Sequence, residues 1–230
     1  MQLILIHGAL GSGAQMIPLA TQLGARFETH VLELEGHGDT PSPHTHFSID
    51  QFAEQLRHFI ATKSLAPARI FGYSMGGYVA LRLASQQPDL IASIATLGTK
   101  LDWSAESAAR ETSRLDPATI RAKVPKFADA LERRHAKSGG WEQMLARTAD
   151  LMRGLGAEPL VDAAGFARIT ARVRLMVGDR DSVVTVDETV RGARALASGE
   201  LAVLPGTPHP LEQVHVPLLA ALLVDFFARG

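Results

Sequence analysis

Short hydrophobic runs alternate with helical patterns along most of the chain. Six of these runs read as strands, and most of them lack the polar alternation of a half-buried strand, which indicates strands covered on both faces. They occupy residues 3–6, 29–34, 69–73, 91–97, 173–177 and 201–204. Helical periodicity follows at 14–24, 48–62, 78–86, 187–196 and 211–228, with Ser48 as an N-cap and Pro88 as a stop signal. The alternation predicts an α/β fold with a mostly parallel sheet of about six strands.

Residues 101–165 break this alternation, because they contain no convincing strand pattern. The segment is rich in alanine, arginine and glutamate and is punctuated by proline and glycine. It predicts several short helices, which form either extra surface helices or a lid over an active site. We favour the lid, because long excursions without strands are usually functional. The predicted organisation is an α/β core at 1–100 and 166–230, with a helical cap or lid inserted at 101–165.

Composition narrows the range of chemistry. The 230 residues include 23 basic and 24 acidic side chains, giving a formal charge of −1. No large net field favours nucleic acid or an anionic membrane, so we expect neither as a partner. The chain has no cysteine, which excludes disulfides, thiol nucleophiles and thiolate metal sites. The histidine spacing matches no metal motif, and we expect neither a metal nor a cofactor. No signal or membrane segment is recognised at the start, so a cytoplasmic location is expected.

The segment G-Y-S-M-G-G at 72–77 lies where a predicted strand becomes a helix. A serine on such a turn needs a strained backbone, and small neighbours make room for it. The pattern G-x-S-x-G in this context is typical of a nucleophile elbow, which identifies Ser74 as the candidate nucleophile. A close-packed turn is the competing interpretation. A phosphate loop is disfavoured, because no G-K-[ST] follows.

The segment H-G-A-L-G-S-G at 7–13 follows the first strand. We expect the backbone N–H groups of Ala9 and Met75 to form an oxyanion hole beside Ser74. A simple glycine-rich turn is the alternative. The glycines do not fit G-x-G-x-x-G, so a dinucleotide site is a weaker alternative.

A serine nucleophile needs a base, and the base needs a carboxylate to orient it. Asp179 and Asp181 follow the strand at 173–177, and His209 follows the strand at 201–204. Both loops lie at the carboxyl ends of strands, where open α/β sheets bind their ligands. His209 is preferred as the base over His215, which falls inside the last helical pattern. His30, His44, His46, His58 and His135 are interpreted as surface or loop residues.

Five segments in this order resemble the α/β-hydrolase fold superfamily over nearly the whole chain. They are His7-Gly8, the stretch E-L-E-G-H-G-D at 33–39, the serine turn, G-D-R-D at 178–181 and G-T-P-H at 206–209. The resemblance implies that the acid is Asp181, three residues after Gly178, and that His37 is structural. Two features depart from the family pattern. The family's usual first two strands have no counterpart, and the histidine motif lacks its usual G-x-G-H form.

The resemblance implies a serine hydrolase with a Ser74–His209–Asp181 triad that acts on a small ester, thioester or similar acyl substrate. An alternative is a carbon–carbon bond hydrolase, or a lyase similar to the menaquinone-pathway 2-succinyl-6-hydroxy-2,4-cyclohexadiene-1-carboxylate synthase group. That group usually has an arginine four residues after the serine, where this chain has Tyr78. A third hypothesis is a binding protein of the same fold that does not turn over its ligand.

Overall fold

Six parallel strands form the centre of the computed structural model, which describes residues 1–229. The strands are β1 (Gln2–Ile6), β2 (Glu28–Leu32), β3 (Ala68–Tyr73), β4 (Ile91–Leu97), β5 (Arg172–Gly178) and β6 (Gly199–Leu204). Their order is β2-β1-β3-β4-β5-β6, and every neighbouring pair is parallel. The predicted α/β sheet is therefore confirmed, with each strand close to its predicted position.

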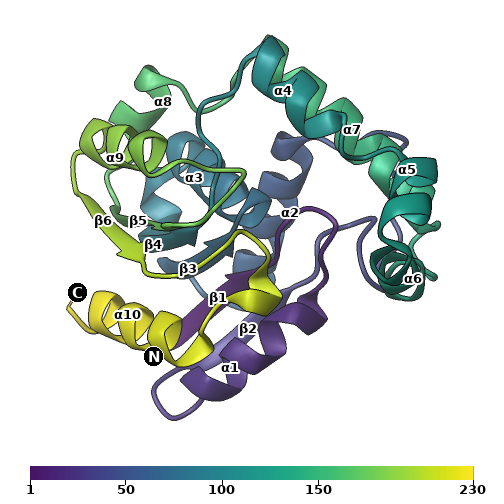
Figure 1. Ribbon diagram of the computed structural model, residues 1–230. Coiled ribbons are helices and arrows are strands. Elements are labelled where there is room, and N and C mark those ends of the chain that lie inside the picture. The colour runs from purple at the N-terminus through teal and green to yellow at the C-terminus, as the bar shows by residue number, and fades with distance from the viewer. Residues whose placement is uncertain (230) are drawn as a thin grey trace.

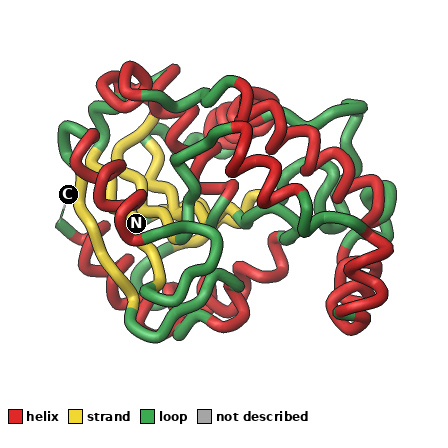
Figure 2. The backbone as a smooth tube through the Cα atoms, turned by 45° about the horizontal axis from the view of Figure 1, so that its top comes forward, coloured by secondary structure: helices red, strands yellow, loops and turns green. Residues whose placement is uncertain are grey.

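Helices cover both faces of this sheet (Figures 1 and 2). Along β1, Leu3 and Leu5 pack with α1 (Ile17–Leu23) and α10 (Val216–Ala228) on one face. Ile4 and Ile6 belong to the hydrophobic cluster on the other face. That face is covered by α2 (Ile49–Thr62), α3 (Met75–Gln86), α8 (Ala163–Arg168) and α9 (Val186–Ala195). The inner strands β1, β3, β4 and β5 are largely buried on both faces, which explains their hydrophobic runs in the sequence. In the edge strand β6, Leu201 and Val203 are exposed.

Four helices between β4 and β5 lie to one side of the sheet (Figure 1). They are α4 (Ala105–Thr112), α5 (Pro117–Lys123), α6 (Pro125–Arg134) and α7 (Trp141–Ala157). The next helix, α8, packs against α3, so the predicted boundary at residue 165 falls within a helix that contacts the core. The division into core and lid stays a prediction, and we use the name cap helices for α4 to α7.

Local chemistry explains where the helices begin and end. The Ser48 hydroxyl accepts a hydrogen bond from Gln51 N at 3.1 Å, as expected of an N-cap. The helical pattern predicted at 14–24 divides into a 3₁₀ turn, η1 (Gly13–Met16), followed by α1. A second 3₁₀ turn, η2 (Pro88–Leu90), follows α3. No helix within residues 1–229 combines the length and hydropathy needed to cross a bilayer.

The helix predicted at 211–228 begins later than expected, so the prediction is wrong for its first turn. The segment forms a 3₁₀ turn, η3 (Leu211–Gln213), and α10 begins only at Val216. His215 was expected inside this helix. It is instead the N-cap residue of α10 and has an extended backbone. Pro217 explains the late start, because proline lacks an N–H and is favoured in the first turn of a helix.

Candidate active site

Ser74 occupies a strained turn between β3 and α3. Its backbone has φ 49° and ψ −117°, outside the regions that most side chains adopt. Ser74 N donates to Leu97 O at 2.8 Å, and the Thr99 hydroxyl donates to Ser74 O at 2.9 Å. A Cβ at Gly72 would lie 2.4 Å from Gly77 N, so the turn closes only because these neighbours are glycines. Ser74 therefore lies on a strained strand-to-helix turn with glycine neighbours, as the sequence predicted.

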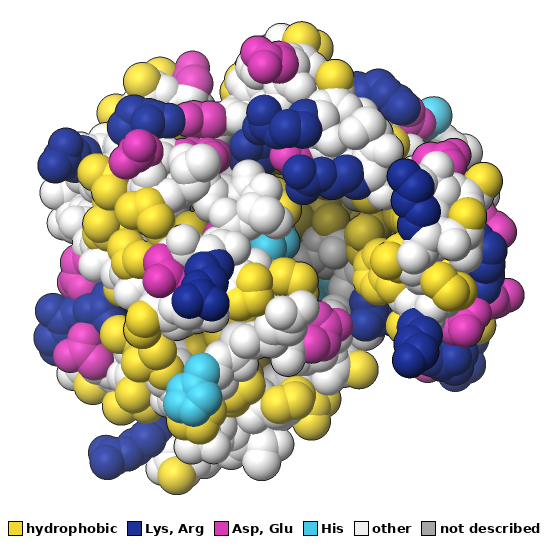
Figure 3. Space-filling model, viewed as in Figure 1, with side chains coloured by type: hydrophobic (Ala, Val, Ile, Leu, Met, Phe, Trp, Pro, Cys, Tyr) yellow, Lys and Arg dark blue, Asp and Glu magenta, His cyan; other side chains and the backbone are white. Residues whose placement is uncertain are grey.

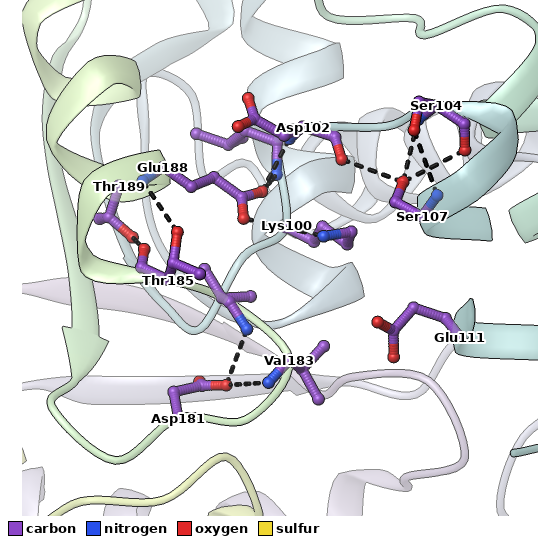
Figure 4. A network of polar contacts seen from close by, with 12 residues as sticks. Lys100, Asp102, Ser104, Ser107, Glu111, Asp181, Val183, Thr185, Glu188 and Thr189 are labelled. Carbon is purple, nitrogen blue, oxygen red and sulfur yellow. Dashed lines mark hydrogen bonds and ion pairs between the residues drawn. The ribbon is translucent and has the colours of Figure 1, made fainter. Parts of the chain in front are cut away.

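His209 and Asp181 extend from Ser74 in a chain of polar contacts. His209 Nε2 lies 3.3 Å from Ser74 Oγ, and His209 Nδ1 lies 2.7 Å from Asp181 Oδ2. The other carboxylate oxygen, Oδ1, accepts hydrogen bonds from Val183 N at 2.8 Å and Val184 N at 2.9 Å. Figure 4 shows Asp181 and Val183 joined in this way. The side chain of Asp181 is only 3% exposed, so nearly all of its hydrogen-bonding capacity is used by these partners.

The neighbouring acid, Asp179, has a different position. Its Oδ1 accepts a hydrogen bond from Thr207 N at 3.1 Å, and Arg180 N donates to Thr207 O at 3.2 Å. These contacts tie the loop after β5 to the loop after β6, which carries His209. The structure therefore brings Asp181, and not Asp179, to the imidazole.

Tyr73 contacts the loop after β6 that carries His209. Its hydroxyl donates to His209 O at 2.7 Å, and the two rings lie 5.5 Å apart. Burial raises the pKa of Tyr73, so the hydroxyl remains a donor over the ordinary pH range. This contact fixes the backbone of His209 directly.

The loop after β1 approaches Ser74 closely. A Cβ at Gly8 would lie 2.9 Å from the Tyr73 ring and 3.0 Å from Ser74 Cβ, so only glycine fits here. The next residue, Ala9, lines the same cavity as Ser74 and Met75. Met75 is the first residue of α3, and the first N–H groups of a helix have no partner within it. Both predicted oxyanion donors thus lie on the wall that surrounds Ser74.

His135 anchors the loop after β1. This contact was not predicted from the sequence. Leu10 has φ 60°, and its carbonyl accepts hydrogen bonds from His135 Nε2 at 3.1 Å and from Arg134 Nη1 at 2.8 Å. Gly38 N donates to His135 Nδ1 at 3.1 Å. Burial lowers the pKa of His135 to about 4, so the ring is neutral near pH 7 and can accept that hydrogen bond.

His135 lies in the turn after α6, as expected of a loop residue, but its side chain is completely buried and does not lie at the surface. His37 is buried beside it and stacks on Phe47 at 5.1 Å between ring centroids. Burial lowers the pKa of His37 well below its usual value. Its packing is consistent with the structural role that the family resemblance implies.

Ser74 and His209 open into a cavity of about 320 Å³ between the sheet and the cap helices. Figure 3 shows a hollow lined largely by hydrophobic side chains, with basic residues along its rim. Hydrophobic lining residues include Ile49, Leu115, Ile120, Leu151 and Leu155. This size and character are typical of a small-molecule site. No three His, Asp or Glu side chains within residues 1–229 are grouped as a metal site.

The aromatic residues between β4 and α7 have different surroundings. Trp103 and Phe127 line the cavity. Trp141 is buried in the hydrophobic core. Tyr78, four residues after Ser74, accepts hydrogen bonds at its hydroxyl from Leu160 N and Val161 N. Its hydroxyl therefore holds the segment that leads from α7 to α8.

Comparison with known proteins assigns the family. The profile described as alpha/beta hydrolase fold matches residues 2–140, and the chain belongs to this family. The 2-(acetamidomethylene)succinate hydrolase of Mesorhizobium japonicum is 24% identical and aligns over 97% of this chain and 87% of its own. The pimeloyl-[acyl-carrier protein] methyl ester esterase of Neisseria meningitidis is 29% identical, over 98% of this chain and 92% of its own.

Solved structures agree on the fold. The crystal structure of E-2-(acetamidomethylene)succinate hydrolase superposes with a TM-score of 0.79 at 21% identity, over 99% of this chain and 91% of that chain. The 2-hydroxy-6-oxo-6-phenylhexa-2,4-dienoate hydrolase of Rhodococcus sp. RHA1 gives 0.78 at 19% identity, over 99% and 90%. The named relatives are hydrolases and esterases, and we class this chain as an enzyme of the same family.

Proposed function

We propose that this protein is a serine hydrolase that cleaves a small ester, thioester or similar acyl substrate through an acyl-enzyme. The observation that supports this most strongly is the contact chain from Ser74 Oγ through His209 to Asp181, at the edge of a mainly apolar cavity. This arrangement contains a nucleophile, a base and a group that orients the base, in hydrogen-bonding positions.

In the proposed reaction, His209 Nε2 removes the proton from Ser74 Oγ as this oxygen attacks the carbonyl carbon of the substrate. Asp181 keeps the Nδ1–H tautomer of His209 in place and stabilises the imidazolium that forms. The imidazolium then protonates the leaving group. Water, deprotonated by His209, attacks the acyl-enzyme and releases the acid. The separation of 3.3 Å between Nε2 and Oγ is consistent with an unliganded site, where such contacts are often long.

Ala9 and Met75 are the proposed oxyanion donors through their backbone N–H groups. The tight fit of Gly8 against Ser74 supports this, because it brings the Ala9 backbone beside the nucleophile. The N-terminus of α3 adds a favourable dipole at the same point. Loss of one such donor raises the activation free energy by about 3–4 kcal/mol in enzymes of this type.

The substrate class follows from the cavity and from the relatives. A volume of about 320 Å³ suits a short acyl chain. One relative is named as a methyl ester esterase and another as a hydrolase of a substituted succinate. Both names describe hydrolysis of carboxylic acid derivatives, which fits an acyl-transfer reaction at Ser74.

The same three side chains could instead serve a carbon–carbon bond hydrolase or a synthase-like lyase, with Ser74 moving a proton. The hydroxyl of Tyr78 is engaged by two backbone N–H groups, and no arginine stands at this position. This speaks against the synthase chemistry. A binding protein without turnover would not require the aligned polar contacts at Ser74.

The proposed function is tested by turnover of p-nitrophenyl acetate and butyrate. We expect Ser74→Ala to lower kcat/KM by roughly 10⁴-fold or more. Ser113→Ala is the matched control, because Ser113 is an exposed serine of the cap helices, and it should keep wild-type turnover. Turnover that survives in Ser74→Ala would contradict the proposal, and turnover confined to a vinylogous diketone would favour the carbon–carbon hydrolase.

A further inference from the structure

Lys100 is a buried cation on the wall of the cavity that contains Ser74. Its side chain is only 8% exposed, and it lines this cavity. It directly follows Thr99, whose hydroxyl donates to Ser74 O at 2.9 Å. Lysine is rarely buried unless it is paired, so its partners indicate whether it is purely structural.

The pairing of Lys100 is looser than a hydrogen bond. Its Nζ lies 3.7 Å from Glu188 Oε2, beyond the usual range for an N–H donor. Glu188 Oε1 is held independently by the backbone, since it accepts from Leu101 N at 2.6 Å and Asp102 N at 2.7 Å. Figure 4 shows Glu188 directed at this segment. Glu188 thus balances the charge of Lys100 at a distance, while the ammonium N–H donors remain suited to a ligand.

A second donor lies on the same wall. The indole Nε1 of Trp103 is buried and has no hydrogen-bond partner within residues 1–229. The Trp103 ring centroid is 5.8 Å from Lys100 Nζ, and both residues line the cavity. A buried N–H without a partner is unfavourable, and an acceptor on a bound ligand would relieve this cost. A cation beside an N–H donor is a suitable pair for an anion.

The other charged groups of the cavity balance one another. Glu111 points into the open space near Val183 (Figure 4), and it contacts Arg110 Nε and Arg114 Nη1, both at 3.3 Å. On the loop side, Arg134 pairs with Glu212 at 3.3 Å. Each acidic group of the lining is therefore matched by an arginine, and Glu188 is the acidic group paired with Lys100.

We propose that Lys100 and the Trp103 N–H bind a carboxylate of the substrate, so that the preferred ester is an anion. This inference rests on the proposed function, because it names the substrate class of the same site. The apolar walls strengthen the contact, since a charged hydrogen bond gains from exclusion of water. A neutral ester would leave both donors without an acceptor, and such unpaired groups discriminate strongly between substrates.

The kinetic test compares three nitrophenyl esters: one with a carboxylate on the acyl chain, one with a carboxylate on the leaving group, and neutral p-nitrophenyl butyrate. The measured quantity is the ratio of kcat/KM for each charged ester to that for the neutral ester. We expect Lys100→Met to lower this ratio by about 10- to 100-fold for one charged ester, which also identifies the side that carries the carboxylate. Lys100→Arg should retain most of the preference.

Lys137→Met is the control, because Lys137 is an exposed lysine paired with Asp39 outside the cavity, and its ratio should match the wild type. If Lys100→Met leaves the ratio unchanged for both charged esters, the proposed carboxylate site is wrong. The proposed hydrolysis at Ser74 would not be affected by this result. Binding of glutarate monomethyl ester to the Ser74→Ala protein, measured by calorimetry, gives a readout without turnover. Lys100→Met should weaken it at least about 10-fold, and equal affinity would again overturn the inference.

Discussion

Asp181→Asn isolates the electrostatic part of the proposed triad, because the substitution keeps the shape of the side chain. In the structure, Oδ1 of Asp181 accepts from Val183 N and Val184 N, while Oδ2 faces His209 Nδ1 at 2.7 Å. In the variant, the amide oxygen is needed by the two backbone donors, so the NH₂ group faces His209. Nδ1 must then become the acceptor, and the ring proton moves to Nε2. In this tautomer, His209 cannot accept the proton of Ser74.

The size of the fall in kcat follows from the energy of the flipped side-chain amide in Asp181→Asn. When the amide is flipped, its oxygen faces His209 and restores the Nδ1–H tautomer. Its NH₂ group then points at the N–H groups of Val183 and Val184. Each buried donor without an acceptor costs about 1–3 kcal/mol, so the active arrangement becomes less stable by about 2–6 kcal/mol. At about 1.4 kcal/mol per factor of ten, kcat should fall by about 30-fold to 10⁴-fold. Loss of the negative charge beside the imidazolium favours the upper part of this range.

The assay is steady-state hydrolysis of p-nitrophenyl butyrate, with urea unfolding to verify that the variant is folded. Asp179→Asn is the matched control, because its oxygen can still accept from Thr207 N. It should retain kcat within about threefold, which corresponds to less than 1 kcal/mol. If Asp181→Asn retains more than a third of wild-type kcat, or if Asp179→Asn loses as much, the proposed role of Asp181 is wrong.

Two further predictions concern the loop after β1. Gly8→Ala should lower kcat/KM by about tenfold or more, since the new Cβ would lie 2.9 Å from the Tyr73 ring and 3.0 Å from Ser74 Cβ; wild-type kinetics in a folded variant would contradict the fit described here. His135 should make stability depend on pH. Burial lowers its pKa from 6.5 to about 4, so the unfolded chain binds the proton more tightly than the folded one. The stability from neutral His135 is present above about pH 6.5 and is lost as the pH falls towards 4, by up to about 1.4 kcal/mol per pH unit. Urea unfolding between pH 7 and pH 4 should give a shallower loss in His135→Gln, and an unchanged slope would count against this account.

The strands could be predicted because burial on both faces leaves a clear signal. In β1, the residues from Leu3 to Ile6 alternate between two covered faces and are all hydrophobic. The start of α10 was also encoded, because Pro217 marks a first helical turn. The prediction of one continuous helix from 211 gave too little weight to this proline and to Pro210.

The three polar residues of the site could be predicted from local motifs and their order in the chain. Choosing Asp181 over Asp179 required the family resemblance, because the residues are two apart and have similar surroundings in the sequence. The structure supplies the physical reason, since Thr207 N engages Asp179 and leaves Asp181 to meet His209. The roles proposed for these residues in catalysis remain predictions.

Contacts between distant segments could not be predicted in the same way. His135 meets Leu10 and Gly38 across separations of 125 and 97 residues. Leu10 and Gly38 lie in motif segments, but His135 belongs to no motif that would link it to them. Lys100 looks like an ordinary lysine after a strand. Its burial beside Ser74 depends on how the segment after β4 and helix α9 pack together, which hydrophobic periodicity does not specify.

The central claim, that Ser74 attacks a carbonyl carbon and forms an acyl-enzyme, is tested most directly by trapping that intermediate. The protein is mixed with excess p-nitrophenyl butyrate, quenched in acid and digested, and the peptides are analysed by mass spectrometry. We expect one butyryl group on the peptide that contains Ser74, located at the serine by fragmentation. We also expect no such adduct in Ser74→Ala. Ser74-dependent turnover without any acyl group on Ser74, or with the group on another residue, would contradict the nucleophilic role and favour a serine that only transfers a proton.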